Sequence, residues 1–228
     1  MYAKLEGVFR KVMNASSLHY VHLLKHLRHF SSVIGFRKVI LDVGSGESPY
    51  RSLFQCNSFV RIDIDKRRKP DLIGDICNLP IRCESTDAVL CIETLEHVPD
   101  TSKALTEIRH VLRGGGYFIL TVPFLFGVHA QADYYRWTER GLRLYLEKYC
   151  FEILELEKNG GIFCVIGETM RHAPYYIVRG RGNRWIKYSL LFILYVLLIL
   201  ITKLFRFFDL LDVKRDYTTG YCVLSIKK

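Results

Sequence analysis

The feature that most constrains this chain is a glycine-containing turn that follows directly on a short apolar run. Residues 38–43 read KVILDV, which has the length and β-branched content of a buried strand, and Gly44-Ser45-Gly46 comes next. Glycines in such a turn let the backbone approach a ligand closely. A strand, a glycine turn and a helix together form the first unit of an open α/β sheet, so we expect a ligand site at this turn.

Short apolar runs alternate with helical patterns through most of the chain. We expect further strands at residues 59–64, 71–76, 87–93, 117–122 and 151–157. We expect helices over 48–55, from a cap at Asp100 or Thr101 to just before Gly114, and from a cap at Thr138 through Tyr149. This order predicts an α/β fold with a largely parallel sheet.

A helix is also expected near the N-terminus, over residues 16–32. Its apolar positions recur at helical spacing, and the opposite stripe carries His19, His22, His26 and His29. Histidines three and four residues apart can chelate a metal, but no carboxylate or cysteine joins them. We therefore expect a solvated polar face or a lid helix rather than a metal site.

Composition narrows the class of protein. The 228 residues suffice for one well-buried domain and not for two large ones. The formal charge of +10 suits a phosphate-rich partner or an anionic membrane surface. Seven cysteines without a CxxC pair exclude a disulfide framework and predict a reducing compartment. The N-terminal residues lack the apolar core of a secretory signal, so we expect an uncleaved chain on the cytosolic side.

The spacing of acidic residues narrows the ligand. Asp63 ends the second predicted strand, 19 positions after Gly44, close to the offset of ~20 expected of a carboxylate that binds ribose hydroxyls. Asp65 is the competing candidate. The third glycine of a dinucleotide fingerprint is missing, because Ser48 stands there, and Asp42 before the turn disfavours a pyrophosphate. The pattern therefore favours a cationic nucleoside such as S-adenosylmethionine (SAM) over NAD.

The motifs resemble those of a known family. ILDVGSGESPY, RIDID, DLIGDICNLP, ETLEHV and LRGGGYFILTVP occur in the order found in class I SAM-dependent methyltransferases of the type-11 group. The resemblance runs from about Lys38 to Glu157. It implies a Rossmann-like, seven-stranded sheet whose last strand, residues 221–228, pairs antiparallel between the fifth and sixth strands. Arg113-Gly114 and Ser48 depart mildly from the family pattern.

The resemblance also implies roles for matching residues. Asp42, Gly44, Ser45 and Gly46 are expected to hold the methionine part of SAM, and Asp63 with Ile64 the ribose. Asp75 and Ile76 are expected to bind the adenine. Glu93 completes this cofactor set and is expected to face the substrate side.

Glu93, Glu96 and His97 form an E-x-x-E-H triplet. Similar triplets bind a divalent metal in ubiquinone-biosynthesis O-methyltransferases and small-RNA 2′-O-methyltransferases. Two carboxylates and an imidazole suit Mg²⁺ or Mn²⁺, and His129 could supply a further ligand. The alternative is that LEH merely opens the next helix, with both side chains satisfied locally.

The segment 129–138 follows the fifth strand, at the sheet edge where such folds bind substrate. It resembles the H-x-x-x-D-Y/F-x-R-x-T element of methyltransferases of bacterial polysaccharide assembly. The candidate catalytic groups are His97, His129 and Glu93, with either histidine as the base that deprotonates a hydroxyl. The candidate substrate contacts are Asp133, Tyr134, Tyr135, Arg136 and Trp137. The alternative is that these side chains only pack and pair within the loop.

Residues 190–201 are twelve consecutive apolar residues, fewer than the ~20 of a spanning helix. Basic residues flank the run on both sides, and one crossing would separate the last strand from the sheet. We expect an insertion that lies on or dips into the membrane. The alternatives are a single span over 188–208 or a homodimer contact. The expected parts are a helical lid (1–36), the SAM-binding core (37–160), the apolar insertion (161–216) and the final strand (217–228).

These features predict a SAM-dependent methyltransferase at the cytoplasmic side of a membrane, peripheral or monotopic. The expected acceptor is a hydroxyl or amine of a lipophilic or lipid-linked molecule such as a glycan intermediate. One rival is an RNA 2′-O-methyltransferase, although no aromatic and basic RNA-binding module is visible and we expect no nucleic-acid partner. The other rival is a non-catalytic, SAM-binding membrane scaffold.

Overall fold

The computed structural model describes residues 17–178, 197, 200–201 and 204–228. The chain divides into two compact units. The helical unit comprises residues 1–23, 125–127 and 158–219, and the sheet unit comprises residues 24–124, 128–157 and 220–228. The two units are described separately below.

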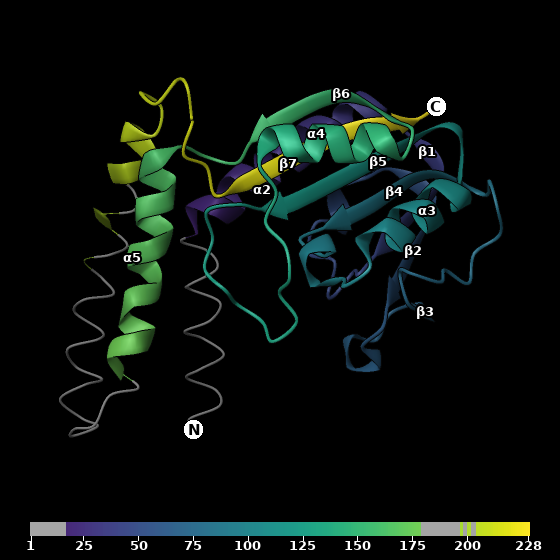
Figure 1. Ribbon diagram of the computed structural model, residues 1–228, viewed down its shortest axis with the longest axis horizontal. Helices are drawn as coiled ribbons and strands as arrows, with labels where there is room; N and C mark the ends of the chain where they lie inside the picture. Colours follow the sequence, from purple (N-terminus) through teal and green to yellow (C-terminus); the bar gives the residue numbers. More distant parts are fainter. Residues whose placement is uncertain (1–16, 179–196, 198–199, 202–203) are drawn as a thin grey trace. The chain divides into compact units, whose positions relative to one another are not determined.

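The sheet unit is built on seven strands in the order β3-β2-β1-β4-β5-β7-β6 (Figure 1). Their bounds are Arg37–Val43 (β1), Cys56–Asp63 (β2), Leu72–Ile73 (β3), Thr86–Ile92 (β4), Leu112–Pro123 (β5), Phe151–Lys158 (β6) and Gly220–Lys227 (β7). β1 pairs in parallel with β2 and β4, and β4 pairs in parallel with β5. β7 is antiparallel to β5 and separates it from β6. The predicted seven-stranded α/β fold is confirmed, including the place of the last strand.

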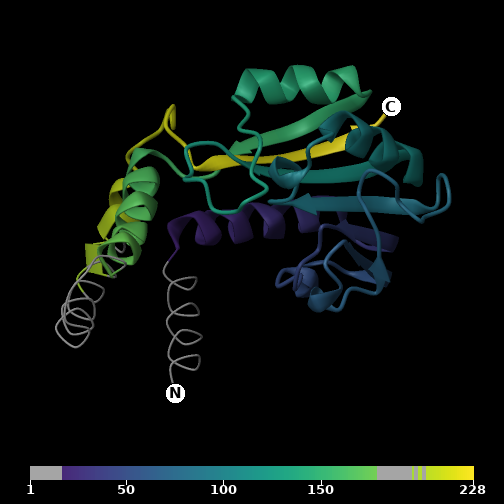
Figure 2. The ribbon, with the colours of Figure 1, turned by 60° about the horizontal axis from the view of Figure 1, so that its bottom comes forward.

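Helices cover both faces of the sheet because side chains alternate along each strand. Figure 2 shows the part of α2 (Leu18–Ile34) that belongs to the sheet unit, residues 24–34, on one face, and α3 (Thr101–Val111) and α4 (Glu139–Lys148) on the other. The α3 and α4 face has a core of buried apolar side chains that includes Leu41, Val89, Leu105, Ile108, Phe118 and Leu146. Asp100 caps α3, since its carboxylate accepts a hydrogen bond from the Lys103 amide at 2.9 Å, and Thr138 caps α4 in the same way.

Three local expectations were wrong. Residues 48–55 form only the 3-10 turn η1 (Arg51–Leu53) rather than a helix. Ser48 has a φ of +47°, and Pro49 disfavours a helical residue before it. The predicted strand over 71–76 shortens to Leu72–Ile73. The helix before Gly114 ends at Val111, and the glycines that follow belong to β5.

The histidine stripe of α2 is not solvated, which corrects the predicted polar face. His19, His22 and His26 are buried, and only His29 is exposed. In the helical unit, His19 Nδ1 lies 2.9 Å from Thr219 Oγ1 and His22 Nε2 lies 3.3 Å from Asp209 Oδ2. In the sheet unit, His29 pairs with Glu155 at 2.8 Å. Polar partners from distant segments therefore offset the cost of burying these imidazoles. The spacing of the histidines in the sequence carries no information about such partners.

The helical unit contains α5 (Ile162–Val178) and the segment that leads to β7. Asp209 and Asp212 accept hydrogen bonds from the Gly161, Ile162 and Cys164 amides at 2.9–3.0 Å, so they satisfy the first turn of α5. In the part of the chain that the structure describes, no helix combines the length and the apolarity needed to cross a membrane. Most of the apolar run 190–201 and its flanking basic residues through Lys203 lie outside the described residues.

Candidate functional site

The glycine turn after β1 has a geometry that only glycine fits at its first position. Gly44 has a φ of +64°, and a Cβ placed there would lie 2.1 Å from Thr94 Cγ2. The Thr94 hydroxyl in turn donates to the Gly44 carbonyl at 3.2 Å. Gly46 also has a positive φ, +51°, but open space surrounds its Cβ position. Ser45 Oγ is buried and has no hydrogen-bond partner among the described residues. The turn thus has a backbone with two positive φ angles and a buried Ser45 hydroxyl that no described group satisfies.

Asp42 is the second-last residue of β1, just before this turn, and is completely buried. Its carboxylate accepts hydrogen bonds from the Ser48 hydroxyl at 2.6 Å and the Tyr50 hydroxyl at 3.3 Å. Burial raises the pKa of Asp42 to about 7, because removal from water disfavours the charged form more than these two hydrogen bonds favour it. Asp42 therefore supports the turn from beneath and is close to half-ionised at neutral pH.

Asp63 and Asp65 differ in their surroundings, which bears on the alternative that the sequence left open. Asp63 is buried, and its two oxygens accept the amides of Gly46 and Asp65, both at 2.8 Å. Each carboxylate oxygen has a second lone pair for a ligand hydroxyl. Asp65 pairs with Arg67 at 2.9 Å, and these hydrogen bonds lower its pKa to about 2. Asp63 is thus tied to the glycine turn, whereas Asp65 is tied to the neighbouring surface arginine.

The remaining cofactor candidates lie at the ends of β2, β3 and β4. Ile64 is exposed beside Asp63, and Ile76 is buried. Asp75 is exposed, with its carboxylate accepting the Cys77 amide at 2.9 Å. Glu93 has a φ of +48° at the end of β4, and its amide donates to the Thr121 carbonyl at 3.2 Å. All four residues therefore follow the carboxyl ends of parallel strands, the edge at which open α/β sheets bind ligands.

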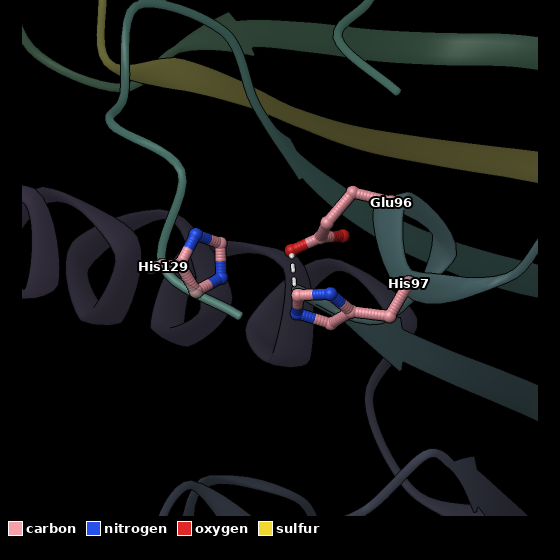
Figure 3. A group of neighbouring side chains, drawn as sticks. All are labelled: Glu96, His97 and His129. Carbon is pink, nitrogen blue, oxygen red and sulfur yellow. Dashed lines mark ion pairs between the residues drawn. The ribbon is translucent and has the colours of Figure 1, made fainter. Parts of the chain in front are cut away.

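Glu96, His97 and His129 form a cluster at this edge (Figure 3). One ligand atom from each residue lies within 4.8 Å of the others, and His97 Nε2 is 3.6 Å from Glu96 Oε1. The structure brings in His129, not Glu93, as the third member of this group. Glu96 is fully buried in the 3-10 turn η3 (Leu95–His97), and neither of its oxygens has a hydrogen-bond partner among the described residues. Burial and the nearby charge of Glu93 raise the pKa of Glu96 to about 9.

A hydrogen bond orients the His97 imidazole, and a nearby carboxylate faces that of His129. His97 Nδ1 contacts the Ala132 carbonyl, which can only accept, so Nδ1 carries the proton. His129 Nδ1 lies 3.2 Å from Asp133 Oδ2, and the side chain of Asp133 is buried. Arg136 pairs with Asp133 and, by hydrogen bonding, lowers the pKa of Asp133 to about 2, so this carboxylate is charged. In the neutral form of each ring, Nε2 is therefore the nitrogen with the lone pair.

The predicted substrate contacts divide into two groups. Asp133 and Arg136 pair with each other and hold the loop, as the packing alternative expected. Tyr134 and Tyr135 are exposed, although the Tyr135 hydroxyl donates to the Pro99 carbonyl at 2.7 Å. Trp137 is half-buried and lies 5.6 Å from the Tyr135 ring. The loop thus offers aromatic faces beside the histidines.

Sequence reasoning missed three residues that shape the site. Thr94 closes the glycine turn, Tyr50 bonds to Asp42, and Ala132 orients His97 through its carbonyl. No motif marks a backbone carbonyl, so Ala132 carried no signal. Thr94 lies inside the E-x-x-E-H triplet, at a position that the motif leaves undefined.

Comparison with known proteins gives a consistent picture. Residues 41–120 match the family model described as a methyltransferase domain. An uncharacterized protein of Methanocaldococcus jannaschii is 33% identical over 91 residues, 37% of this chain and 40% of that protein. A tRNA (carboxymethyluridine(34)-5-O)-methyltransferase of Arabidopsis thaliana is 34% identical over 96 residues, 37% of this chain and 24% of that protein. The chain therefore spans less than half the length of these curated relatives.

Solved structures show the same fold over more of the chain. A Bacillus halodurans protein assigned to the methyltransferases superimposes with a TM-score of 0.57 at 16% identity, covering 90% of this chain and 98% of that one. At such low sequence identity, the similarity shows a shared fold only. Residues 41–120 thus resemble a methyltransferase domain, and the sheet around them has the same fold as this solved structure.

Proposed function

We propose that this protein transfers the methyl group of SAM to a hydroxyl, or to an amine, of a lipophilic or lipid-linked acceptor such as a glycan intermediate. The observation that carries the proposal is the paired arrangement at the sheet edge. The glycine turn with Asp63 lies at the ends of β1 and β2, and two oriented histidines follow β4 and β5. A nucleoside site beside a potential base is what methyl transfer to a protic acceptor requires.

The residues of the turn fit SAM, which supplies a methyl group on a positively charged sulfur. The orphaned Ser45 hydroxyl and the positive-φ backbone of Gly44 and Gly46 form a polar cradle. Asp63 retains acceptor capacity for the ribose hydroxyls, and Asp75 with Ile76 lies where the adenine is expected. The pKa of Asp42 is about 7, so only the ionised fraction of this carboxyl would favour the cationic ligand through space.

The histidines can take the acceptor proton. His129 is our first candidate, because Asp133 fixes its Nδ1 as the donor and stabilises the imidazolium that forms. The acceptor oxygen attacks the methyl carbon in line with the carbon–sulfur bond, which breaks. The proton passes to Nε2, and the products are a methyl ether and S-adenosylhomocysteine. Glu93, at the end of β4, is the candidate for orienting the acceptor.

Glu96, His97 and His129 also fit a divalent cation. A buried carboxylate without a hydrogen-bond partner and two imidazoles with fixed tautomers are a suitable ligand set, and the two nitrogens favour Mn²⁺ over Mg²⁺. Such an ion would acidify an acceptor hydroxyl bound to it. His129 would then be a ligand rather than the base, and metal dependence distinguishes the two roles.

The nature of the acceptor and its location rest on the sequence. The polysaccharide resemblance of segment 129–138 and the exposed Tyr134 and Tyr135 support a sugar or ring-bearing acceptor. The apolar run at 190–201 supports a reaction at the cytoplasmic membrane surface. The boundaries given above for the lid, the core, the insertion and the final strand stay predictions. The homodimer contact through the apolar helix stays the alternative to membrane attachment.

The test is transfer of radioactive methyl groups from SAM to a total lipid extract and its lipid-linked glycans. We expect labelled lipid with the wild type and at least a hundredfold loss with His129→Ala. The matched control is His110→Ala, which removes an exposed histidine of α3 and should change nothing. Chelation by EDTA should abolish turnover if the cation is required, with recovery on adding Mn²⁺. Unchanged turnover in His129→Ala would remove both roles of this residue.

An RNA methyltransferase is the second candidate, because part of the chain resembles the Arabidopsis tRNA methyltransferase. The basic charge would permit RNA binding. Labelled RNA in place of labelled lipid in the same assay, with binding that weakens steeply as salt rises, would favour this candidate.

A further inference from the structure

The helical unit carries an apolar stripe that faces solvent. Residues 197, 200–201 and 204–208 are helical. The outward stripe consists of residues at helical spacing, each at least 50% exposed: Leu197, Leu200, Leu204, Phe207 and Leu211. Intervals of three and four residues place the helical members of this stripe on one face, and Leu211 follows in the turn that ends the helix. Leu210 and Val213 extend the exposed apolar surface beyond the helix.

The opposite face of the same segment is already used for packing. Phe205 and Phe208 lie against Phe163 of α5, with ring centroids 6.0 and 5.5 Å from the Phe163 ring. In Figure 1 the ribbon of this segment runs beside α5. Asp209 is buried against the start of α5. A surface helix normally turns its polar face outward once its apolar face is packed. This segment instead turns apolar side chains outward as well, which is typical of an interaction surface.

The charges beside the stripe are mainly positive. Arg206 and Lys214 are exposed. Asp209 and Asp212 come from the same segment, but their carboxylates are turned toward backbone amides of α5. Asp216 is exposed near Lys214, and its carboxylate lies 3.7 Å from the Lys158 ammonium. Two copies that met through this stripe would bring like charges together, which opposes a homodimer. Anionic headgroups would instead attract the rim while acyl chains receive the leucines and Phe207.

We propose that the outward stripe is a docking surface for anionic lipid bilayers. It binds with the apolar side chains at the boundary of headgroups and acyl chains, and with Arg206 and Lys214 at the phosphates. The inference rests on the proposed function in one respect, since docking would bring the site to a lipid-linked acceptor. Lipid binding itself requires neither SAM nor turnover, so its failure is distinguishable from failure of methyl transfer.

The test is co-sedimentation of the full chain with vesicles of phosphatidylcholine alone and with 30% phosphatidylglycerol. We expect binding to the anionic vesicles that weakens at high salt. The triple variant Leu204→Gln, Phe207→Gln, Leu211→Gln should bind about a hundredfold more weakly. The double variant Arg206→Glu, Lys214→Glu should lose about twenty-fold or more on anionic vesicles. The matched control is Leu144→Gln, an equally exposed leucine on α4 of the sheet unit, which should bind like the wild type.

Circular dichroism of each variant, measured in the same preparations, shows that the fold is kept without relying on SAM binding. Wild-type protein that ignores anionic vesicles overturns the proposal. So does a triple variant that binds as well as the wild type, since the membrane contact would then lie elsewhere. A wild-type dimer that the triple variant splits, without any lipid binding, would assign the stripe to a second copy of the chain instead.

Discussion

Single residues in the glycine turn are constrained by different forces. At Gly44 the constraint is steric as well as conformational, because Thr94 fills the place of a side chain. At Gly46 it is conformational alone. At Asp42 it is electrostatic, since a carboxyl group is held out of water and satisfied by two hydroxyls. The motif predicted that these residues matter, but the three separate reasons follow only from the packing.

The two glycines make a matched pair for a test of this difference. Gly44→Ala should destabilise the fold by about 2–4 kcal/mol, because both the positive φ and the contact with Thr94 oppose a Cβ. Gly46→Ala should cost only about 1 kcal/mol, the cost of the φ alone. Urea unfolding monitored by circular dichroism measures both values. Equal losses would show that Thr94 does not enforce the turn.

The raised pKa of Asp42 predicts a pH-dependent stability. In the fold this carboxyl keeps its proton up to about pH 7, whereas its ordinary pKa is 3.8, because burial disfavours the charge. Stability from this group is therefore present below 3.8 and is lost as the pH rises toward 7, by up to about 1.4 kcal/mol per pH unit. Asp42→Asn removes the titration, so its stability relative to the wild type should rise over this range and level off above it.

Urea unfolding of both proteins at several pH values between 4.5 and 8 measures the difference. Asp216→Asn, at an exposed aspartate, is the control. A difference between Asp42→Asn and the wild type that does not vary with pH would contradict the assignment.

At the scale of elements, the strands were more predictable than the segments between them. Buried strands such as β1 and β4 read as apolar runs, and the family resemblance placed β7 between β5 and β6. The expected helix at 48–55 failed, since Pro49 and the positive φ of Ser48 oppose it. The burial of the α2 histidines also escaped prediction, because their partners, such as Asp209 and Thr219, come from the far end of the sequence.

The start of α5 gives a test at this scale. Asp209 satisfies the amides of Gly161 and Cys164 and pairs with His22. Burial raises the pKa of Asp209, but hydrogen bonds from His22 and these amides outweigh it, so the pKa lies below 3.8. Asp209→Ala should therefore cost about 2–4 kcal/mol at pH 7, and this difference should shrink as the pH falls below 3.8.

Thermal unfolding of Asp209→Ala beside Asp216→Ala, an exposed aspartate, provides the measurement and its control. A loss no larger than that of the control would show that the cap on α5 is dispensable.

At the scale of the whole molecule, the sheet unit holds the proposed SAM site and the helical unit holds the proposed docking surface. The fold and the cofactor family of the sheet unit could be predicted from sequence, because β-strand patterning and the glycine turn are local signals. The grouping of Glu96 and His97 with His129 could be predicted only in part, since it depends on how the loop after β5 folds back. The acceptor could not be derived, because exposed tyrosines accept many partners.

The central claim is that the edge formed by β1 and β2 binds SAM through Asp63. The most direct measurement is calorimetric titration of SAM into the wild type, Asp63→Ala and Asp65→Ala. The account predicts micromolar binding by the wild type and by Asp65→Ala, and its loss in Asp63→Ala. Folded wild-type protein that shows no binding, or binding that survives in Asp63→Ala and vanishes in Asp65→Ala, would contradict it.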